Sequence, residues 1–125
     1  MGKILLVDDG EDLCRLFTES LGQEGFQVVA ARSGHEALAL LELEPPDLIV
    51  LDLVMQDMDG FEILRRLRKR GEAVKVVVLT AHGTAQRVRE AMTLGVREFL
   101  GKPFDLNRLL RIVAEEVGGR SLLAQ

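Results

Sequence analysis

Five residues of this chain combine a reactive or metal-binding side chain with one kind of position, because each stands at or just beyond the end of a short apolar run. They are Asp8, Asp9, Asp52, Thr80 and Lys102. Three carboxylates, a hydroxyl and an ammonium are groups suited to binding a divalent cation together with a phosphoryl group. The question for the sequence is then whether the elements around them would bring these five side chains together.

The apolar runs have the character of buried β-strands. Most of the runs are continuous rather than alternating, which is typical of strands covered on both faces. They occupy residues 4–7, 28–31, 48–51, 74–79 and 96–100. We therefore predict five strands.

A segment with helical spacing of apolar residues follows each run. Capping signals mark four of the helix starts, namely Ser33 with Glu36, Asp59 with Glu62, Thr84, and Asp105. The apolar positions expected to face the sheet are Leu13, Leu16, Phe17 and Leu21; Ala37, Leu38, Leu40 and Leu41; Phe61, Leu64 and Leu67; Val88, Ala91, Met92 and Leu94; and Leu106, Leu109, Leu110, Ile112 and Val113.

Strands and helices that alternate in this way predict a single α/β domain with a parallel sheet between two layers of helices. Right-handed crossovers place the carboxyl ends of all parallel strands on the same edge of the sheet. Ligands of open sheets bind at that edge, near the point where the strand order reverses. The five polar residues are therefore expected to meet there.

Composition limits the other classes of function. The chain has 125 residues, 47% of them hydrophobic, and a net charge of −4, which argues against nucleic-acid binding by the surface as a whole. The basic run at residues 65–70 is interpreted as a solvated helix end. No apolar stretch is long enough to span a membrane. The single Cys14 is expected to be a small core or boundary residue, and a reducing cytoplasm is the natural compartment.

The carboxylates themselves point to metal-assisted phosphoryl chemistry. Three of them in one cleft repel one another and need a hard cation, and magnesium takes one or two carboxylates with water and phosphate oxygens. Asp52 is the best-placed nucleophile for an aspartyl phosphate, with Lys102 and Thr80 on the phosphoryl oxygens. The plainer alternative is that Asp8 or Asp9 only caps the first helix.

At this point the sequence resembles the receiver domain of two-component response regulators. The resemblance covers about residues 3–117 and rests on motifs in matching order and spacing: Asp8-Asp9, Leu51-Asp52-Leu53, Met58-Asp59-Gly60, Thr80-Ala81 and Lys102-Pro103-Phe104. It implies a flavodoxin-like, doubly wound sheet of five parallel strands in the order 2-1-3-4-5 with five helices. Residues 1–117 would be the receiver domain and residues 118–125 a tail or linker stub.

The resemblance also implies roles for individual residues. Asp52 would be the phosphoacceptor, and Mg²⁺ would be bound by Asp8, Asp9, Asp52 and the backbone carbonyl of Val54. Thr80 would be the switch hydroxyl and Lys102 the phosphate-contacting lysine, with a cis bond before Pro103. Phosphorylation would draw Thr80 inward and turn the aromatic residue of the fifth strand, Phe99, into the vacated space. An ordinary core role for Phe99 is the alternative.

The same resemblance names classes of partner. The phosphodonor would be a sensor histidine kinase or a phosphotransfer protein, and the receiver assists its own phosphorylation and dephosphorylation without being a metabolic enzyme. The receiver would control an output domain or effector protein, or form a homodimer on phosphorylation, with no membrane and no direct nucleic acid contact. The signalling face would join the fourth helix, fifth strand and fifth helix, with the arginines Arg87, Arg89, Arg97, Arg108 and Arg111.

Some positions depart from the family pattern or tune it. Gln56 replaces a proline that is usual four residues after the phosphoacceptor, which makes that loop less rigid. Val54 and His82 occupy positions that set the lifetime of the phosphoryl group. Because Val54 cannot hydrogen-bond an attacking water, slow self-dephosphorylation is predicted. His35 is interpreted as a solvated surface residue.

Three other interpretations compete with this one. A haloacid-dehalogenase-like phosphatase would carry a second Asp where Val54 stands, and a nucleotide-binding fold would need a Gly-rich loop after the first strand. A receiver-like module that works without phosphorylation is the main alternative. The intact set of Asp8, Asp9, Asp52, Thr80 and Lys102 argues against it.

Overall fold

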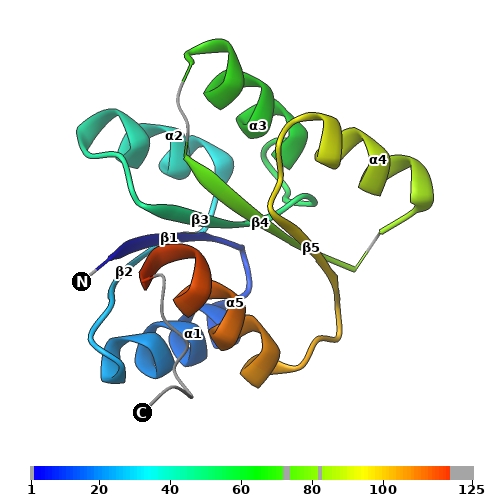
Figure 1. Ribbon diagram of the computed structural model, residues 1–125. Helices are drawn as coiled ribbons and strands as arrows, with labels where there is room; N and C mark the ends of the chain where they lie inside the picture. The colour runs from blue at the N-terminus through cyan, green and yellow to red at the C-terminus, as the bar shows by residue number, and fades with distance from the viewer. Residues whose placement is uncertain (1, 72–73, 82, 119–125) are drawn as a thin grey trace.

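The computed structural model describes residues 2–71, 74–81 and 83–118, which form five strands and five helices in alternation (Figure 1). In chain order the elements are β1 (Lys3–Val7), α1 (Glu11–Gln23), β2 (Gln27–Ala31), α2 (Gly34–Leu43), β3 (Leu48–Asp52), α3 (Gly60–Lys69), β4 (Lys75–Thr80), α4 (Ala85–Thr93), β5 (Glu98–Gly101) and α5 (Leu106–Gly118). The predicted five strand–helix units are thus confirmed.

All neighbouring strands pair in parallel, and their order across the sheet is β2-β1-β3-β4-β5. This confirms the predicted order 2-1-3-4-5. The order reverses between β1 and β3, because the chain first builds outward to β2 and then crosses to the other side. The carboxyl ends of β1 and β3 therefore border the reversal point, where open sheets bind ligands.

Two helical layers cover the sheet, with α1 and α5 on one face and α2, α3 and α4 on the other (Figure 1). Alternate residues of each strand supply the two cores, since successive side chains point to opposite faces. Ile4 and Leu6 pack with α1 and α5, whereas Leu5 and Val7 pack with the three other helices. Burial on both faces explains why the strands read as continuous apolar runs.

All four helix caps that the sequence predicts form hydrogen bonds. The side chains of Ser33, Asp59 and Thr84 accept hydrogen bonds from backbone N–H groups in the first turns of α2, α3 and α4. Asp105 likewise accepts a hydrogen bond from the N–H of Asn107 at the start of α5. These caps fix where each helix begins, and thereby the length of the loop that precedes it.

For two apolar residues, the prediction that they face the sheet is wrong. Leu16 is 48% exposed and Met92 is 51% exposed. The face of α1 that is buried carries Cys14, Phe17 and Leu21, and in α4 the buried residue is Ala91. Each exposed residue is adjacent in sequence to a buried one, which turns it by about 100° around the helix axis.

Otherwise the structure differs from the prediction only by small shifts of the strand boundaries. The fifth strand is Glu98–Gly101 rather than residues 96–100, and the other strands agree with the prediction to within one residue at either end. The peptide bond between Lys102 and Pro103 is cis, as the resemblance implies. No helix in the described part of the chain has the length and apolar character that a bilayer crossing requires.

Candidate functional site

The register of the sheet brings the predicted acidic residues to one edge. Val7 of β1 lies beside Leu51 of β3, so that Asp8 and Asp52 are the next residues on adjacent strands. Asp9 follows in the loop to α1. Carboxylate oxygens of Asp8, Asp9 and Asp52 lie within 4.8 Å of one another. We call these three residues the acidic edge.

The same geometry positions the hydroxyl and the ammonium. Thr80 ends β4 one residue beyond Leu79, the partner of Asp52 in the register. Thr80 itself pairs with Gly101 of β5, and Lys102 is the residue after Gly101. All five residues singled out in the sequence therefore lie at the carboxyl end of the sheet.

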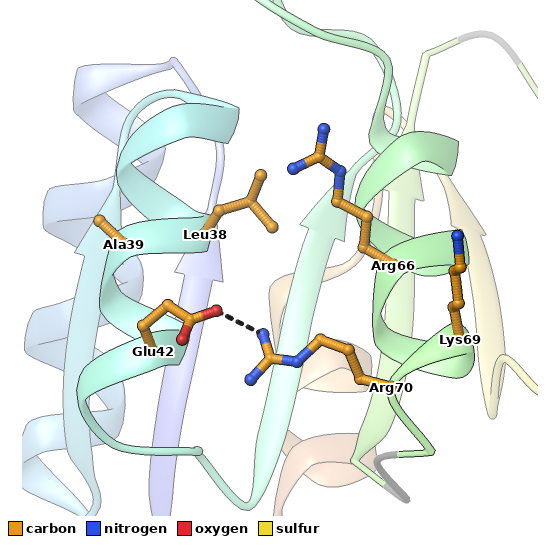
Figure 2. Close-up of a pocket in the computed structure, with 6 residues that line it drawn as sticks. All are labelled: Leu38, Ala39, Glu42, Arg66, Lys69 and Arg70. Carbon is orange, nitrogen blue, oxygen red and sulfur yellow. Dashed lines mark hydrogen bonds and ion pairs between the residues drawn. The ribbon is translucent and has the colours of Figure 1, made fainter.

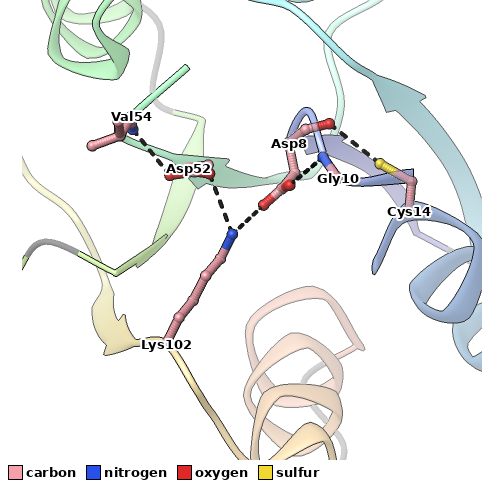
Figure 3. A network of polar contacts seen from close by, with 6 residues as sticks. All are labelled: Asp8, Gly10, Cys14, Asp52, Val54 and Lys102. Carbon is pink, nitrogen blue, oxygen red and sulfur yellow. Dashed lines mark hydrogen bonds and ion pairs between the residues drawn. The ribbon is translucent and has the colours of Figure 1, made fainter. Parts of the chain in front are cut away.

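Lys102 is the cation between two of the carboxylates. Its Nζ lies 2.7 Å from Oδ2 of Asp8 and 3.3 Å from Oδ2 of Asp52 (Figure 3). Burial alone would lower the pKa of Lys102, but the hydrogen bond to Asp8 and the charges of Asp8 and Asp52 outweigh burial, and the pKa is raised. Lys102 is therefore held as an ammonium that points into the acidic edge.

Asp52 is oriented by its own loop. Its Oδ1 accepts a hydrogen bond from the backbone N–H of Val54 at 3.0 Å, while Oδ2 faces Lys102 (Figure 3). Asp52 is 6% exposed, and burial raises the pKa of its carboxyl, partly offset by the Val54 N–H and by Lys102. A desolvated carboxylate beside other carboxylates gains from any cation that enters.

The acidic edge has the donor set of a divalent metal site. Asp8 is 1% exposed and Asp52 is 6% exposed, whereas Asp9 is exposed. Oδ1 of Asp8 accepts a hydrogen bond from the N–H of Gly10 at 2.7 Å. Two unit negative charges about 4 Å apart repel by about 4 kcal/mol at an effective dielectric near 20. One ammonium facing three carboxylates leaves an excess of negative charge that a hard cation would neutralise.

Cys14 adjoins this network without adding to its chemistry. The thiol is buried and donates to the backbone carbonyl of Asp8, with 3.3 Å between Sγ and O (Figure 3). Burial, and next the charge of Asp8, raise the pKa of the Cys14 thiol, so that it stays protonated. The prediction of a small core residue is confirmed.

The two predicted switch residues lie on adjacent strands, β4 and β5, two register positions apart. Thr80 is fully buried, and Phe99 pairs with Val78 in the adjacent strands and is half-buried. Phe99 packs under the loop after β4, where a Cβ on Gly83 would lie 2.9 Å from the Phe99 ring. The side chain is therefore covered by a loop residue rather than free in solvent. His82, the predicted tuning residue, lies outside the described residues.

An open hollow of about 530 Å³ borders the acidic edge and is lined by Asp9, Arg32 and Gln56. It places Gln56, the departure from the family pattern, beside an acid of the cluster. Arg32 was not singled out in the sequence. A lone arginine after the second strand carries no signal of its own, and only the strand order brings it near Asp9.

A second hollow, of about 440 Å³, lies between α2 and α3, away from the acidic edge (Figure 2). Its residues are Leu38, Ala39, Glu42, Arg66, Lys69 and Arg70. Arg70 and Glu42 join the two helices across it with a 2.9 Å ion pair. An exposed, already paired carboxylate and its arginine contribute to surface packing and make no reactive centre.

The basic run at residues 65–70 is not merely a solvated helix end, and for Arg68 that interpretation is wrong. Arg68 is half-buried, and its guanidinium donates to the carbonyls of Leu94, Val74 and Gly95. These carbonyls belong to the end of α4 and the start of β4. The charge pattern of the sequence gave no sign of this, because capping of a neighbouring helix depends on tertiary position.

Sequence reasoning also passed over Asp57. Its carboxylate contacts His35, with 2.6 Å between Oδ2 and Nδ1, so that the exposed His35 has a partner on the loop after β3. The two residues are 22 positions apart and belong to different elements, and no periodic pattern links them. A turn that carries several acids was the only available hint.

Comparisons with known proteins agree with this geometry. A family model described as the response regulator receiver domain matches residues 4–114. The chain is 37% identical over 107 residues to sporulation initiation phosphotransferase F of Bacillus subtilis strain 168, and the alignment covers 86% of each chain. Its fold is similar to that of the non-phosphorylated HemR receiver domain from Leptospira biflexa, with a TM-score of 0.88, 34% identity, and 93% and 94% of the two chains covered.

A longer relative shows how much of some proteins the chain spans. It is 39% identical over 110 residues to transcriptional regulatory protein GlrR of Escherichia coli K12, which covers 88% of this chain and 25% of that protein. The likeness to this relative is therefore to one part of a larger regulator.

Proposed function

Because this chain belongs to the family of response regulator receiver domains, a signalling domain of two-component systems, we propose that Asp52 is its phosphoacceptor. The carrying observation is the arrangement of Asp52: a buried carboxylate with one oxygen on the Val54 N–H and the other facing Lys102. The proposal also includes Mg²⁺ as the bound cation and two classes of partner, a phosphodonor and a recipient of the signal.

The transfer step follows from the positions of these groups. An oxygen of Asp52 attacks the phosphorus of a phosphohistidine, a P–O bond forms, the P–N bond breaks, and the imidazole leaves with its electron pair. Lys102 lies 3.3 Å from Asp52, where its charge stabilises one phosphoryl oxygen. Thr80, at the end of the adjacent strand, supplies a hydroxyl for another. Positioning and charge neutralisation suffice for such a transfer.

The oxygen ligands of the acidic edge fit Mg²⁺. Asp8, Asp9, Asp52 and the backbone carbonyl of Val54 would hold it, and the buried pair Asp8 and Asp52 supplies the desolvated negative charge that favours a hard cation. When bound, Mg²⁺ neutralises the carboxylates and the phosphoryl oxygens. Lys102 would then turn from the carboxylates towards the phosphoryl group.

The response to phosphorylation would travel through Thr80 and Phe99. A phosphoryl group at Asp52 offers strong acceptors to the Thr80 hydroxyl. Phe99 packs under the loop that follows Thr80, so that movement of that loop changes its contacts. The affected surface would be that of α4, β5 and α5, where Arg97 pairs with Glu116 and Arg108 with Glu98.

The partners are proposed by class. The donor would be a sensor histidine kinase or a phosphotransfer protein, and the recipient an output domain, an effector protein or a second copy of the chain. The relatives include a sporulation phosphotransferase and a transcriptional regulator, which supports both arrangements. Residues 1–117 would form the receiver with 118–125 as tail or linker, supported by the family match over residues 4–114. A cytoplasmic location stays a prediction.

The test is intact-protein mass spectrometry after incubation with acetyl phosphate, with and without Mg²⁺. We expect the parent to gain one phosphoryl group only with Mg²⁺, and Asp52→Ala to gain none. Asp47→Asn is the control, because this aspartate lies at the opposite end of β3, where its carboxylate accepts from the Lys3 N–H. A gain that persists in Asp52→Ala would refute the assignment.

The phosphorylation-independent alternative is separated by the next measurement. If the parent gains no phosphoryl group and also forms no beryllofluoride complex, and if Asp52→Ala keeps the binding partners of the parent, the chain acts as an interaction module. The complete set of Asp8, Asp9, Asp52, Thr80 and Lys102 at one edge favours phosphorylation over this alternative.

Val54 offers a test of phosphoryl lifetime. Its side chain is 42% exposed, beside the site, and has no polar atom to position an attacking water. We expect the phosphorylated parent to decay slowly and Val54→Asn to decay several-fold faster, measured by loss of the phosphorylated mass over time. Val54→Ala should resemble the parent, and an Asn variant that decays no faster than either would contradict the role of Val54.

A further inference from the structure

The loop between β3 and α3, residues 53–59, is attached at its tip to α2, which lies beside α3 on the same face of the sheet. Oδ1 of Asp57 accepts a hydrogen bond from the N–H of Gly34, and Oδ2 accepts one from the N–H of His35, both at 2.9 Å. In a third contact, His35 Nδ1 lies 2.6 Å from Oδ2 of Asp57. A carboxylate from one loop thus binds the first turn of α2 through three contacts.

The next residue of the loop packs against the same turn. A Cβ on Gly34 would overlap Cγ of Met58, so that only glycine allows this approach. Gly34 is buried, although it stands at the start of a helix. Asp57 and Met58 together therefore fasten the loop to α2 by charge, hydrogen bonds and close packing.

This attachment completes the hydrogen bonding of α2. The first N–H groups of a helix lack partners within it. Ser33 satisfies one of them, since its Oγ accepts a hydrogen bond from the N–H of Glu36. The N–H groups of Gly34 and His35 are satisfied by Asp57 instead. The helix thus has one capping residue of its own and a second that the loop after Asp52 provides.

The base of the same loop forms part of the proposed phosphorylation site. The N–H of Val54 donates to Asp52 Oδ1 at 3.0 Å, and Val54 also forms a bridge with Asp59. The N–H of Gly60 donates to the carbonyl of Leu53 at 2.9 Å, which closes the loop at its base. The tip that binds α2 and the backbone that contacts the phosphoacceptor thus belong to the same short, closed loop.

We propose that Asp57 is a positioning residue for phosphoryl transfer, which holds the loop of residues 53–59, and with it the backbone of Val54, against Asp52 by binding the first turn of α2. The inference rests on the proposed function, because it concerns the Val54 carbonyl and N–H at the Asp52 site. It assigns to Asp57 no contact with the phosphoryl group or the cation.

The central experiment compares Asp57→Ala with Ser33→Ala. Both variants lose a cap of α2, but only Asp57→Ala releases the loop, and Ser33 contributes nothing to the phosphorylation site. We measure the Mg²⁺ titration midpoint, the initial rate of phosphorylation by acetyl phosphate, and the melting temperature. Loss of groups that orient metal ligands typically costs about 10–100-fold in affinity or activity.

For Asp57→Ala we expect a weakening of Mg²⁺ binding and of the phosphorylation rate near the lower end of that range, about 10-fold. For Ser33→Ala we expect a lower melting temperature, with both other quantities close to those of the parent. Asp57→Asn keeps one oxygen acceptor and should lie between Asp57→Ala and the parent. If Asp57→Ala does not fold, the comparison of Asp57→Asn with Ser33→Ala replaces it.

The amide resonance of Val54 supplies a readout that helix capping alone would not move. In ¹H–¹⁵N spectra it should shift in Asp57→Ala, because its hydrogen bond to Asp52 loosens, and it should keep its parent position in Ser33→Ala. Equal losses of stability in both variants, with parent-like Val54 shifts, Mg²⁺ midpoints and rates, would overturn the inference and leave Asp57 as a helix cap only.

Failure of the proposed function would look different. In that case the parent itself would show no Mg²⁺-dependent phosphorylation, and the inference would be refuted together with it. A parent that is phosphorylated, with Asp57 variants that match it in rate and Mg²⁺ midpoint, refutes the positioning role alone.

Discussion

The acidic edge and the helical flank, by which we mean the polar contacts of α2 and α3, carry charge in opposite ways. At the acidic edge, the ammonium of Lys102 contacts buried Asp8 and Asp52, and exposed Asp9 adds a third carboxylate within 4.8 Å. On the flank the paired charges meet an opposite charge or, at Asp57 and Arg68, a set of backbone dipoles. The exposed pairs there join Arg65 to Glu90, Arg66 to Glu62 and Arg70 to Glu42.

The difference teaches that the density of charge does not identify a site. The basic run at residues 65–70 is the most conspicuous charged segment of the sequence, yet its arginines connect α3 to neighbouring helices, apart from Arg66, which pairs within α3. The acidic edge has fewer charges, but Asp8 and Asp52 are desolvated and its negative charge is unbalanced, which is costly until a ligand balances it. Unbalanced burial is therefore the better sign of function.

The largest effect is expected from removing the single cation of the acidic edge. Without divalent cations, Lys102→Met should lower the free energy of unfolding by about 2–3 kcal/mol, because Asp8 and Asp52 lose their partner. This is less than is typical of fully buried pairs, since Lys102 is 26% exposed. Urea unfolding at about pH 7 measures it in full, because a raised lysine pKa keeps the ammonium charged up to and beyond about pH 10.4.

Added Mg²⁺ should then stabilise Lys102→Met by more than it stabilises the parent, because the cation replaces the missing charge. Phosphorylation by acetyl phosphate should fall in the same variant. If Lys102→Met proves as stable as the parent without Mg²⁺, repulsion between the carboxylates of the acidic edge does not lower stability. The contrast between the acidic edge and the helical flank would then be contradicted.

On the helical flank, Arg68 is expected to be the exception. Arg68→Ala should cost about 2 kcal/mol of unfolding free energy, because the carbonyls of Leu94, Val74 and Gly95 lose a charged donor in a half-buried setting. Arg70→Ala, on the same helix, should cost about 0–1 kcal/mol as an exposed ion pair. Equal effects in chemical denaturation would show that burial does not separate the two arginines.

A third test separates the exposed acid of the edge from its buried neighbours. Asp9→Asn should weaken Mg²⁺ binding about 10-fold, or about 1.4 kcal/mol, while changing stability without metal by less than about 0.5 kcal/mol. Asp8→Asn should lose both Mg²⁺ affinity and stability without metal, since Asp8 also forms hydrogen bonds with Gly10 and Lys102. Isothermal titration and urea unfolding of both variants decide the matter. A large loss of stability in Asp9→Asn without metal would contradict the scheme.

Much of this arrangement could be predicted from the sequence, because it depends on patterns that repeat. Continuous apolar runs and helical spacing fix the strands, the helices and hence the edge on which Asp52 and Thr80 meet. What could not be predicted depends on which segments become neighbours. Arg68 caps a helix 26 residues away, and Asp57 binds a helix 22 and 23 residues before it. Such contacts leave no period in the sequence.

Exposure of Leu16 and Met92 has the same origin. Each follows the helical spacing of its segment, and only the packed position of the helix decides which of two adjacent apolar residues is covered. The sequence thus specifies faces of elements well, and their rotation on the sheet less well. Lower rigidity of the loop of residues 53–59 at Gln56 stays a prediction, and the structure adds contacts of Asp57 and Met58 with α2 that the sequence did not indicate.

The smallest effect, and the sharpest contrast, is expected in the pH dependence of stability. Burial raises the pKa of Asp52, so that its charge opposes folding; the cost is present above the folded pKa and vanishes in acid. The N–H groups of Gly34 and His35 hold the pKa of Asp57 well below its usual range, so that its charge supports folding. That support is present above about pH 3.9 and is lost as the pH falls towards the folded pKa.

Substitutions by Asn should therefore act with opposite signs. In the absence of divalent cations at about pH 7, Asp52→Asn should melt above the parent and Asp57→Asn below it, and both differences should shrink as the pH falls below about 4. Ser33→Ala, an uncharged cap lost from α2, should keep a constant difference over the same range. If the deficit of Asp57→Asn also stays constant into acid, the ionised carboxylate is not what fastens the loop. The packing of Met58 on Gly34 would then be the contact that holds the loop to α2.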